Sequence, residues 1–367
     1  MTETANKYYK QLFGLTIVLL GIGLAMVYSA SYSTSAEKYG YSYFFFLRQI
    51  VYAGAGIFIM YVVSLVDYRI FKKLAYLLLI LSFFMLILTF VPGIGRKING
   101  ANRWIGLGPI NIQPSEMAKV FLIIFVAYLL EKKESKLESF SFGFLPCVLI
   151  PGFVMLVVLL QRDLGCFAIM GCMIFIMMFL GGVKIKHLLL PVILFGASVG
   201  ILIIKFPYRL NRILAYLHPF KYYHGSGYQS SQSLISFGAG GIIGRGIGNS
   251  MAKHHYLPEA FTDYIFSILA EELGFVGVFV VVVLFLLFFI TGIRLSLKVK
   301  DKFGRLLGLG LTILITVQAF INMAVCTNLL PPKGLVLPFF SYGGSSLIVN
   351  LFAVGILLSI ARDLENV

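Results

Sequence analysis

Charged residues are scarce in this sequence. Of its 367 residues, 12% are Asp, Glu, Lys or Arg, whereas about 25% is usual in a soluble globular domain. A water-soluble chain of this length needs a charged surface, so the composition excludes a soluble enzyme. Apolar residues of the AVILMFWYC set reach 59% and the mean hydropathy is +0.93, which excludes a disordered chain. The sequence therefore predicts an integral membrane protein.

Cysteine is also scarce, and its spacing is uninformative for metal binding. The four cysteines fall in or near apolar segments without paired metal-ligand spacing: Cys147, Cys166, Cys172 and Cys326. This pattern excludes a secreted disulfide scaffold and favours small packing residues. A cleavable signal is not evident, because residues 1–10 are polar and the first apolar run lacks a small-residue cleavage site. We expect that run to remain as a spanning helix.

Acidic residues are few, 15 against 30 basic ones, which gives a net charge of +15. In a soluble protein such a balance can indicate nucleic-acid binding. In a membrane protein, the enrichment of cytoplasmic loops in Lys and Arg explains most of the excess. We therefore predict no nucleic-acid partner and expect contacts with membrane lipids.

Long apolar runs are what the sequence has in abundance. Each is long enough for a helix to cross roughly 30 Å of hydrocarbon. The predicted fold class is an all-α polytopic bundle of about ten transmembrane helices, which forms a single membrane domain over residues 1–367. The predicted spans are residues 12–30, 45–66, 73–91, 115–130, 142–160, 164–182, 187–206, 264–292, 306–330 and 340–361.

Three connections are longer than the others, at residues 92–119, 205–263 and 331–346. Lys and Arg concentrate in the remaining loops, which places the N-terminus and the C-terminus in the cytoplasm and these three segments outside. The connection 205–263, between the seventh and eighth spans, far exceeds the usual loop length. Because long ordered loops often carry function, we expect chemistry at the outer face of the cytoplasmic (inner) membrane.

Two charged residues lie in the predicted fourth span, where a charge is costly and needs a reason. Glu116 and Lys119 are three residues apart, so they share one helix face and can pair. Pro114 marks the start of that helix. Two interpretations stay open: a mutually neutralising structural pair, or a pair lining an outward cavity in which Lys119 meets an anionic ligand.

A second pair of acids lies where the long loop ends and the eighth span begins. Asp263 follows Glu259 by four residues, so the two carboxylates can raise one another's pKa or share a divalent cation. Either arrangement suits a general base. The structural alternative for Asp263 is stabilisation of a helix N-terminus. Glu271 and Glu272 lie two turns deeper, and we expect them to pair with polar groups on other helices.

Basic and small residues in the outer segments suggest anion binding. Several basic residues of the long loop, namely Arg209, Arg212, Lys221, Arg245 and Lys253, fit either a phosphate-bearing substrate or lipid headgroups. The glycine-rich stretch 238–248 lacks a Walker or dinucleotide pattern but could offer backbone N–H groups to phosphate. Lys333 and Ser341 lie at the outer mouth of the last span. Asp163 fits a short outer turn, with a structural or a functional role.

Taken together, five blocks resemble one known family. They are GANRWIGLGPINIQPSEMAK (100–119), QRDLG (161–165), GSGYQSSQSLISFGAGG (225–241), YLPEAFTDYIFSILAEELG (256–274) and PKGLVLPFFSYGGSS (332–346). In this order they are similar to the SEDS family of bacterial peptidoglycan polymerases, over nearly all ten spans. Lys333-Gly334 and the Pro-Glu-Ala at 258–260 look more like the family's cell-division member than its elongation member. Tyr264 and Phe261 depart from the usual pattern, but the acid between them is retained.

The resemblance implies a peptidoglycan glycosyltransferase that polymerises lipid II into β-1,4 glycan strands at the outer membrane face during septal wall synthesis. It implies that Asp263 is the general base and that Glu116 and Lys119 matter for function. Its partners would be a class B penicillin-binding protein, which is a transpeptidase, and other membrane proteins of the division machinery. The remaining predicted substrate-binding residues are Arg103, Arg209, Arg212, Glu259, Lys333 and Ser341.

Two other functions fit a polytopic chain with buried charges. A lipid II flippase would show the same features, although the polar residues here cluster on the outer side. A non-catalytic division scaffold is the third hypothesis. Mg²⁺ or Mn²⁺ is compatible with a pyrophosphate substrate, but the residues do not require a metal ion.

Overall fold

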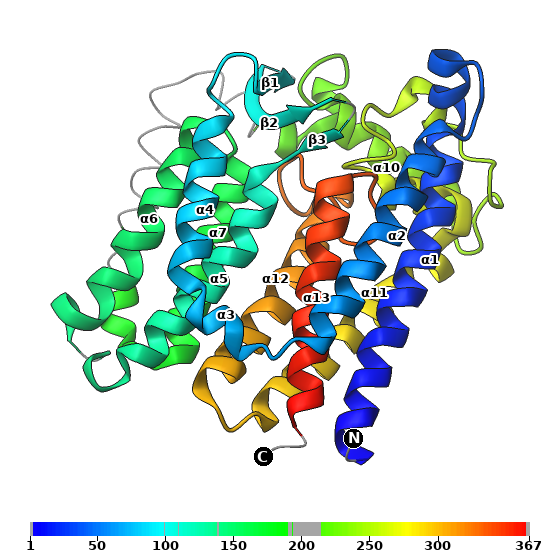
Figure 1. The fold of residues 1–367 in the computed structure, drawn as a ribbon. Helices are drawn as coiled ribbons and strands as arrows, with labels where there is room; N and C mark the ends of the chain where they lie inside the picture. Colours follow the sequence, from blue (N-terminus) through cyan, green and yellow to red (C-terminus); the bar gives the residue numbers. More distant parts are fainter. Residues whose placement is uncertain are drawn as a thin grey trace.

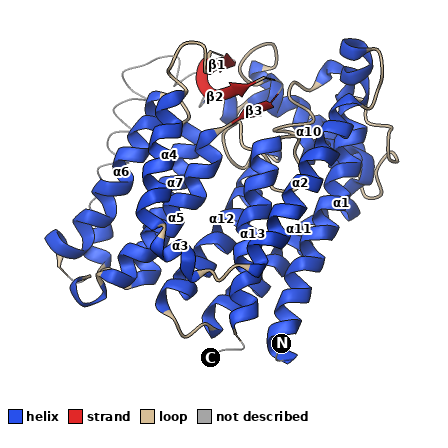
Figure 2. Cartoon of the chain, viewed as in Figure 1, coloured by secondary structure: helices blue, strands red, loops and turns tan. Residues whose placement is uncertain are grey.

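A computed structural model describes residues 3–98, 100–108, 110–137, 139–189, 193 and 214–364. Most of the predicted seventh span, with Arg209 and Arg212, lies outside these residues. The described chain is mostly helical, as predicted (Figure 2). Its main helices are α1 (Glu3–Tyr39), α2 (Phe44–Leu65), α3 (Arg69–Lys73), α4 (Ala75–Leu88), α5 (Pro114–Lys132), α6 (Leu145–Leu160), α7 (Leu164–Gly181), α10 (Tyr228–Gly240), α11 (Ile265–Lys298), α12 (Lys302–Cys326) and α13 (Gly344–Asp363). Single turns lie at Glu134–Lys136, Phe140–Phe144, Pro219–Tyr222 and Ala252–Tyr256.

The helices form a bundle with a buried centre and an apolar periphery. Six of them, α1, α2, α7, α11, α12 and α13, are long and apolar enough to cross a membrane, and α4 and α6 are shorter apolar helices. In α12 and α13, 72% and 78% of the most apolar window is buried, against 22% in α2 and α11. The inner helices therefore pack against protein, whereas outer side chains such as Phe58, 68% exposed, are suited to lipid. The chain is an integral membrane protein.

Both termini of the chain lie at the same end of the bundle (Figure 1). The opposite end carries α10 and a small antiparallel sheet of β1 (Gly95–Ile98), β2 (Ala101–Leu107) and β3 (Ile110–Ile112), in that order. The purely helical prediction missed this sheet. Gly100, with φ of 78°, provides the tight turn between β1 and β2 that a residue with a Cβ rarely adopts.

Helix α11 is broken near its N-terminal end. Gly274 has φ of 63° and ψ of −163°, which no helix accommodates. The backbone of Gly244 approaches Gly274 so closely that a Cβ on either residue would collide with the other chain segment. The two glycines therefore let the long outer loop pack against the start of α11. This contact fixes the segment that leads to Asp263.

Candidate active site

Asp263 lies in the last turn before α11, at the end of the bundle opposite the termini. Its backbone N–H donates to the carbonyl of Glu259 at 3.1 Å. Its own carbonyl accepts from Nδ2 of Asn322, on α12, at 2.8 Å. Glu259 adopts φ of 56° to close this turn. The backbone is thus held on both sides, while the partly buried carboxylate accepts no hydrogen bond from the described side chains.

The surroundings make Asp263 a weak acid. Burial, together with the negative charges of Glu259 and Asp163, raises the pKa of its carboxyl from 3.8 to about 7, against the opposing effect of Arg103. A carboxyl with a pKa near neutrality is matched to proton transfer at physiological pH. The environment therefore suits a general base, and no side-chain hydrogen bond caps the start of α11.

Asp163 lies at the centre of the charged groups around Asp263. It is 2% exposed, and its Oδ1 accepts from the backbone N–H of Cys166 at the start of α7. Its Oδ2 lies 3.9 Å from Nε of Arg103 and has no hydrogen-bond partner among the described residues. Desolvation by the surrounding atoms lowers the pKa of Lys333, and the negative charge of Asp163 opposes this shift. Asp163 thus caps the start of α7, and its negative charge acts on Asp263.

A glycine allows the loop between α12 and α13 to approach Asp263. A Cβ on Gly334 would lie 2.9 Å from Oδ2 of Asp263, so a side chain there would displace the carboxylate. Lys333 precedes Gly334 in this loop, and its charge interacts with Asp163. The loop 327–343 therefore forms one wall of the site.

Helix α12 holds both this loop and the turn that carries Asp263. Asn322 Nδ2 donates to the carbonyl of Leu335 at 2.5 Å as well as to that of Asp263. One turn earlier, Gln318 Nε2 donates to the carbonyl of Val336 at 3.1 Å. Two side chains on one helix face thus fix the distance between the acid and the opposing loop.

The pair of Glu116 and Lys119 on α5 supports this arrangement through Gln318. Lys119 Nζ lies 2.8 Å from Glu116 Oε1 and 2.6 Å from Gln318 Oε1. Lys119 is 2% exposed and Glu116 4%. The idea that Lys119 faces an anionic ligand is not what the structure shows, because its ammonium is enclosed and already paired. The pair orients Gln318, which in turn holds the loop at Val336.

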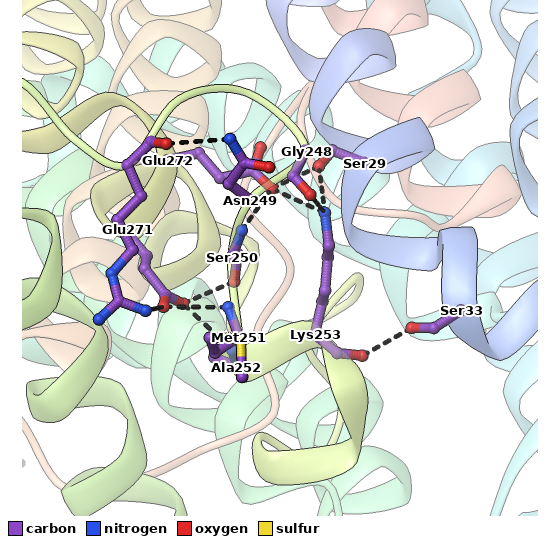
Figure 3. Close-up of polar contacts among 11 residues, drawn as sticks. Ser29, Ser33, Gly248, Asn249, Ser250, Met251, Ala252, Lys253, Glu271 and Glu272 are labelled. Carbon is purple, nitrogen blue, oxygen red and sulfur yellow. Dashed lines mark hydrogen bonds and ion pairs between the residues drawn. The ribbon is translucent and has the colours of Figure 1, made fainter.

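Glu271 binds the long outer loop through its whole carboxylate. Oε1 accepts from the backbone N–H of Met251 and from Arg245, both at 3.0 Å. Oε2 accepts from Ser250 Oγ at 2.6 Å and from the backbone N–H of Ala252 at 3.1 Å (Figure 3). Four donors compensate for the burial of this charge. Glu271 therefore pairs mainly with a loop, rather than with another helix as predicted.

Glu272 links the same loop to α1. Its Oε1 accepts from Ser29 Oγ at 2.5 Å and from Lys253 Nζ at 3.1 Å, and the carbonyl of Lys253 accepts from Ser33 Oγ at 2.9 Å (Figure 3). Here the predicted pairing with another helix is confirmed, because Ser29 belongs to α1. Glu271 and Glu272 together anchor residues 245–253, a few residues before Asp263.

The glycine-rich stretch 238–248 uses part of its backbone N–H groups inside the protein. Arg245 and Gly246 donate their backbone N–H groups to the carbonyls of Glu271 and Glu272, both at 3.0 Å. Donors that are occupied inside the protein cannot hold a phosphate. Arg245 and Gly246 are therefore excluded as phosphate donors, and Gly240 and Gly244 serve the close packing against α11.

The other predicted binding residues differ in their placement. Arg103 donates through Nη2 to the carbonyl of Arg162 at 2.6 Å and borders the site. Glu259 is exposed, and its Oε2 accepts from Thr262 at 2.9 Å. Ser341 is 5% exposed, and its hydroxyl accepts from the backbone N–H of Leu337 at 2.8 Å, so it stabilises a turn. Arg209 and Arg212 lie outside the described residues.

The residues around Asp263 do not fit a protein metal site. Among the described residues, no three His, Cys, Asp or Glu side chains come together in a way that could hold a metal ion. We therefore derive no catalytic step through Mg²⁺ or Mn²⁺.

Residues 10–366 match the family described as cell cycle proteins and named after FtsW, RodA and SpoVE. The chain is 44% identical over 352 residues to a probable peptidoglycan glycosyltransferase FtsW of Geobacter sulfurreducens (strain DL-1 / KN400), with 96% of this chain and 94% of the relative covered. It is 42% identical over 349 residues to the stage V sporulation protein E of Bacillus subtilis (strain 168), with 95% of each chain covered.

Two solved structures have the same fold. One comes from a study of how a peptidoglycan synthase complex coordinates polymerization and crosslinking; it matches with a TM-score of 0.80 and 28% identity, over 96% of this chain and 97% of that chain. The other is the rod shape determining protein RodA of Thermus thermophilus, with a TM-score of 0.71 and 28% identity over 96% of each chain.

Proposed function

The chain belongs to the FtsW, RodA and SpoVE family of cell cycle proteins, and we infer that it is a peptidoglycan glycosyltransferase in which Asp263 is the general base. One observation carries the assignment of the base. Asp263 is a partly buried acid with a pKa of about 7, it interacts with the charge of Arg103, and it lies against the loop that carries Lys333. An acid that is half-protonated near neutral pH, next to cations, suits the removal of a sugar proton beside a lipid-linked diphosphate.

The reaction needs a base, an in-line acceptor and a stabilised leaving group. Asp263 takes the proton of the acceptor sugar's 4-hydroxyl while that oxygen attacks the anomeric carbon of the donor. The bond from the anomeric carbon to the diphosphate oxygen breaks, and polyprenyl diphosphate leaves with the bonding electron pair. A single displacement inverts the α-linked donor and gives a β-1,4 bond. Arg103 and Lys333 offset the negative charge of the leaving group.

The rigid parts of the site supply its geometry. Asn322 fixes the Asp263 turn and Gln318 fixes the facing loop, so α12 sets the distance across the site. Glu271 and Glu272 anchor the preceding loop to α11 and α1. Such preorganisation lowers the reorganisation needed during reaction.

The chain's orientation and partner follow from the same assignment. The site lies at the outer face, with both termini in the cytoplasm, as the distribution of Lys and Arg indicates. The likeness to a chain of a peptidoglycan synthase complex supports a crosslinking partner, a class B penicillin-binding protein. The FtsW relatives support a role at the division septum. Residues 1–367 act as one membrane domain.

A polymerisation assay with purified protein tests this function. With lipid II supplied in detergent, where no membrane barrier separates the enzyme from its substrate, we expect the protein and its partner to release long glycan strands. The product can be resolved by gel electrophoresis after labelling. If lipid II moves across vesicle membranes but no polymer forms in detergent or in vesicles, the protein is a flippase. If neither polymerisation nor movement occurs, the scaffold hypothesis remains.

A further inference from the structure

The N-terminal end of α2 lies against the loop 327–343, which forms one wall of the site. Helix α2 packs along α13 (Figure 1), and this packing continues to the first turn of α13. A Cβ on Gly344, the first residue of α13, would lie 2.7 Å from the ring of Tyr52. Gln49 and Phe45 precede Tyr52 by three and seven residues, so all three share one face of the helix. That face of α2 therefore adjoins the end of the loop.

Gln49 binds the backbone of this loop through both ends of its carboxamide. The side chain is 1% exposed. Its Nε2 donates to the carbonyl of Ser341 at 3.1 Å, and its Oε1 accepts from the backbone N–H of Gly343 at 3.3 Å. The two bonds lie on either side of Tyr342. Because a buried polar group left without a partner is costly, this double contact holds the backbone around Tyr342 in one conformation.

Tyr342 in turn binds the turn that carries Asp263. Its backbone N–H donates to the carbonyl of Phe261 at 2.9 Å. The ring centroid of Phe45 lies 4.8 Å from that of Phe261 and 5.1 Å from that of Tyr342, and the Phe261 and Tyr342 centroids are 5.8 Å apart. Aromatic rings at such distances attract one another beyond the effect of their burial. The three rings thus join α2, the Asp263 turn and the loop.

The Asp263 turn is therefore held at two points. Asn322 on α12 holds the carbonyl of Asp263, and Tyr342 holds the carbonyl of Phe261, two residues earlier. Two fixed carbonyls restrict the rotation of a turn as well as its position. The first contact depends on α12, whereas the second depends on Gln49, which fixes the backbone around Tyr342. Helix α2 is thus a second support of the turn, separate from α12.

The orientation of the turn decides how much water reaches Asp263. Its Oδ2 faces Gly334 so closely that a Cβ there would lie 2.9 Å away. A turn rotated away from Gly334 would hydrate the carboxylate, and hydration favours the ionised form. The other charged and titratable groups come from the same turn, β2, the start of α7, α12 and the facing loop; they are Glu259, Tyr264, Arg103, Asp163, Cys326 and Lys333.

We propose that Gln49 is a positioning residue for the base: by holding the backbone on both sides of Tyr342, it keeps the Asp263 turn oriented toward the facing loop. The proposal rests on the proposed function, in which Asp263 is the base. Gln49 is buried and acts through Tyr342 and Phe261. Its loss should therefore change the state of Asp263 even when no substrate is bound.

The test is an infrared titration of the Asp263 carboxyl in the full-length protein in nanodiscs, with the spectrum of Asp263→Asn subtracted to isolate its band. Gln49→Leu removes both hydrogen bonds at nearly the same size. Gln49→Asn keeps the polarity but is one methylene shorter, so it cannot bridge both backbone groups, and it answers the question where Gln49→Leu does not fold. The thermal midpoint and the polymerisation kinetics are measured in the same samples.

Asn350→Leu is the matched control. Asn350 is a carboxamide on α13, 5% exposed, and its Nδ2 donates to the carbonyl of Ser346 at 2.8 Å and to its Oγ at 3.2 Å. Both bonds lie within one helix, so their loss should lower the thermal midpoint without releasing the loop or the Asp263 turn.

We expect the wild-type carboxyl to titrate near pH 7. In both Gln49 variants the titration midpoint should fall by about one pH unit or more toward the ordinary value, because the released turn hydrates the carboxylate. The kcat of polymerisation should fall roughly 10- to 10²-fold from misplacement of the base, with KM little changed, since Gln49 does not touch the substrate. Asn350→Leu should change neither the titration midpoint nor kcat.

A titration midpoint that stays at the wild-type value in the Gln49 variants, or that shifts equally in Asn350→Leu, overturns the proposal. A fall in kcat that follows only the loss of folded protein overturns it as well. If the midpoint shifts as expected but polymerisation by wild type does not follow the ionisation of Asp263, the positioning of this acid by Gln49 stands and the assignment of Asp263 as the base fails.

Discussion

Protein carrying Asp263→Asn is expected to polymerise lipid II about 10²- to 10⁴-fold more slowly than wild type, which is the usual contribution of a general base. Asn keeps the size and shape of the side chain, so the close approach of Gly334 is preserved. It cannot accept the proton of the sugar hydroxyl at neutral pH. The rate is measured as glycan formed per unit time by purified protein with its partner.

The stability of this variant separates lost chemistry from lost fold. The folded-state pKa of Asp263, about 7, lies above the ordinary value of 3.8. The contribution of this carboxyl to stability is therefore complete below pH 3.8 and is lost as the pH rises through 7. Since Asn never ionises, Asp263→Asn should melt at pH 8 at the same temperature as wild type or higher. Asp67→Asn, at an exposed site near the other end of the bundle, is the matched control and should retain full activity.

Lys119→Met is expected to cause the largest loss of stability, about 3–5 kcal/mol, because it leaves the Glu116 carboxylate buried and unpaired. The thermal midpoint in detergent should fall accordingly. Polymerisation should fall as well, since Gln318 loses the partner that orients it toward the loop at Val336.

Two further variants define the cause of that loss. The double variant E116Q/K119M removes both charges and should recover most of the stability, because an apolar replacement of a buried ion pair is often neutral. Lys72→Met removes a similar pair with Glu131, but Lys72 is 41% exposed, so the cost should stay within about 1 kcal/mol. A double variant no more stable than Lys119→Met would contradict a role for the pair in mutual neutralisation.

Much of the fold could be predicted from the sequence because membrane spans depend on local composition. The predicted spans 164–182 and 340–361 correspond closely to α7 (Leu164–Gly181) and α13 (Gly344–Asp363). The β1–β3 sheet was missed because its strands are short and their pairing depends on turns at Gly100 and Gly108, both with positive φ. Local apolar length carries no information about such pairing.

The site was predictable in its residues but not in their connections. Spacing placed Glu116 and Lys119 on one helix face, yet it could not reveal which face, so their burial against Gln318 on α12 was not anticipated. Asp163 was left between two roles, because its proximity to Arg103 arises from separate segments of the chain. Long-range contacts of this kind depend on packing, which periodicity within one helix does not encode.

The most direct test of Asp263 as the base is the pH dependence of kcat/KM for polymerisation, which reports the ionisation of the free enzyme. If Asp263 must be ionised, kcat/KM should rise about tenfold per pH unit in the acid range and level off with an apparent pKa near 7, the value its surroundings impose. A profile that stays flat from about pH 5 to pH 8, well across the pKa of this carboxyl, would contradict the central assignment.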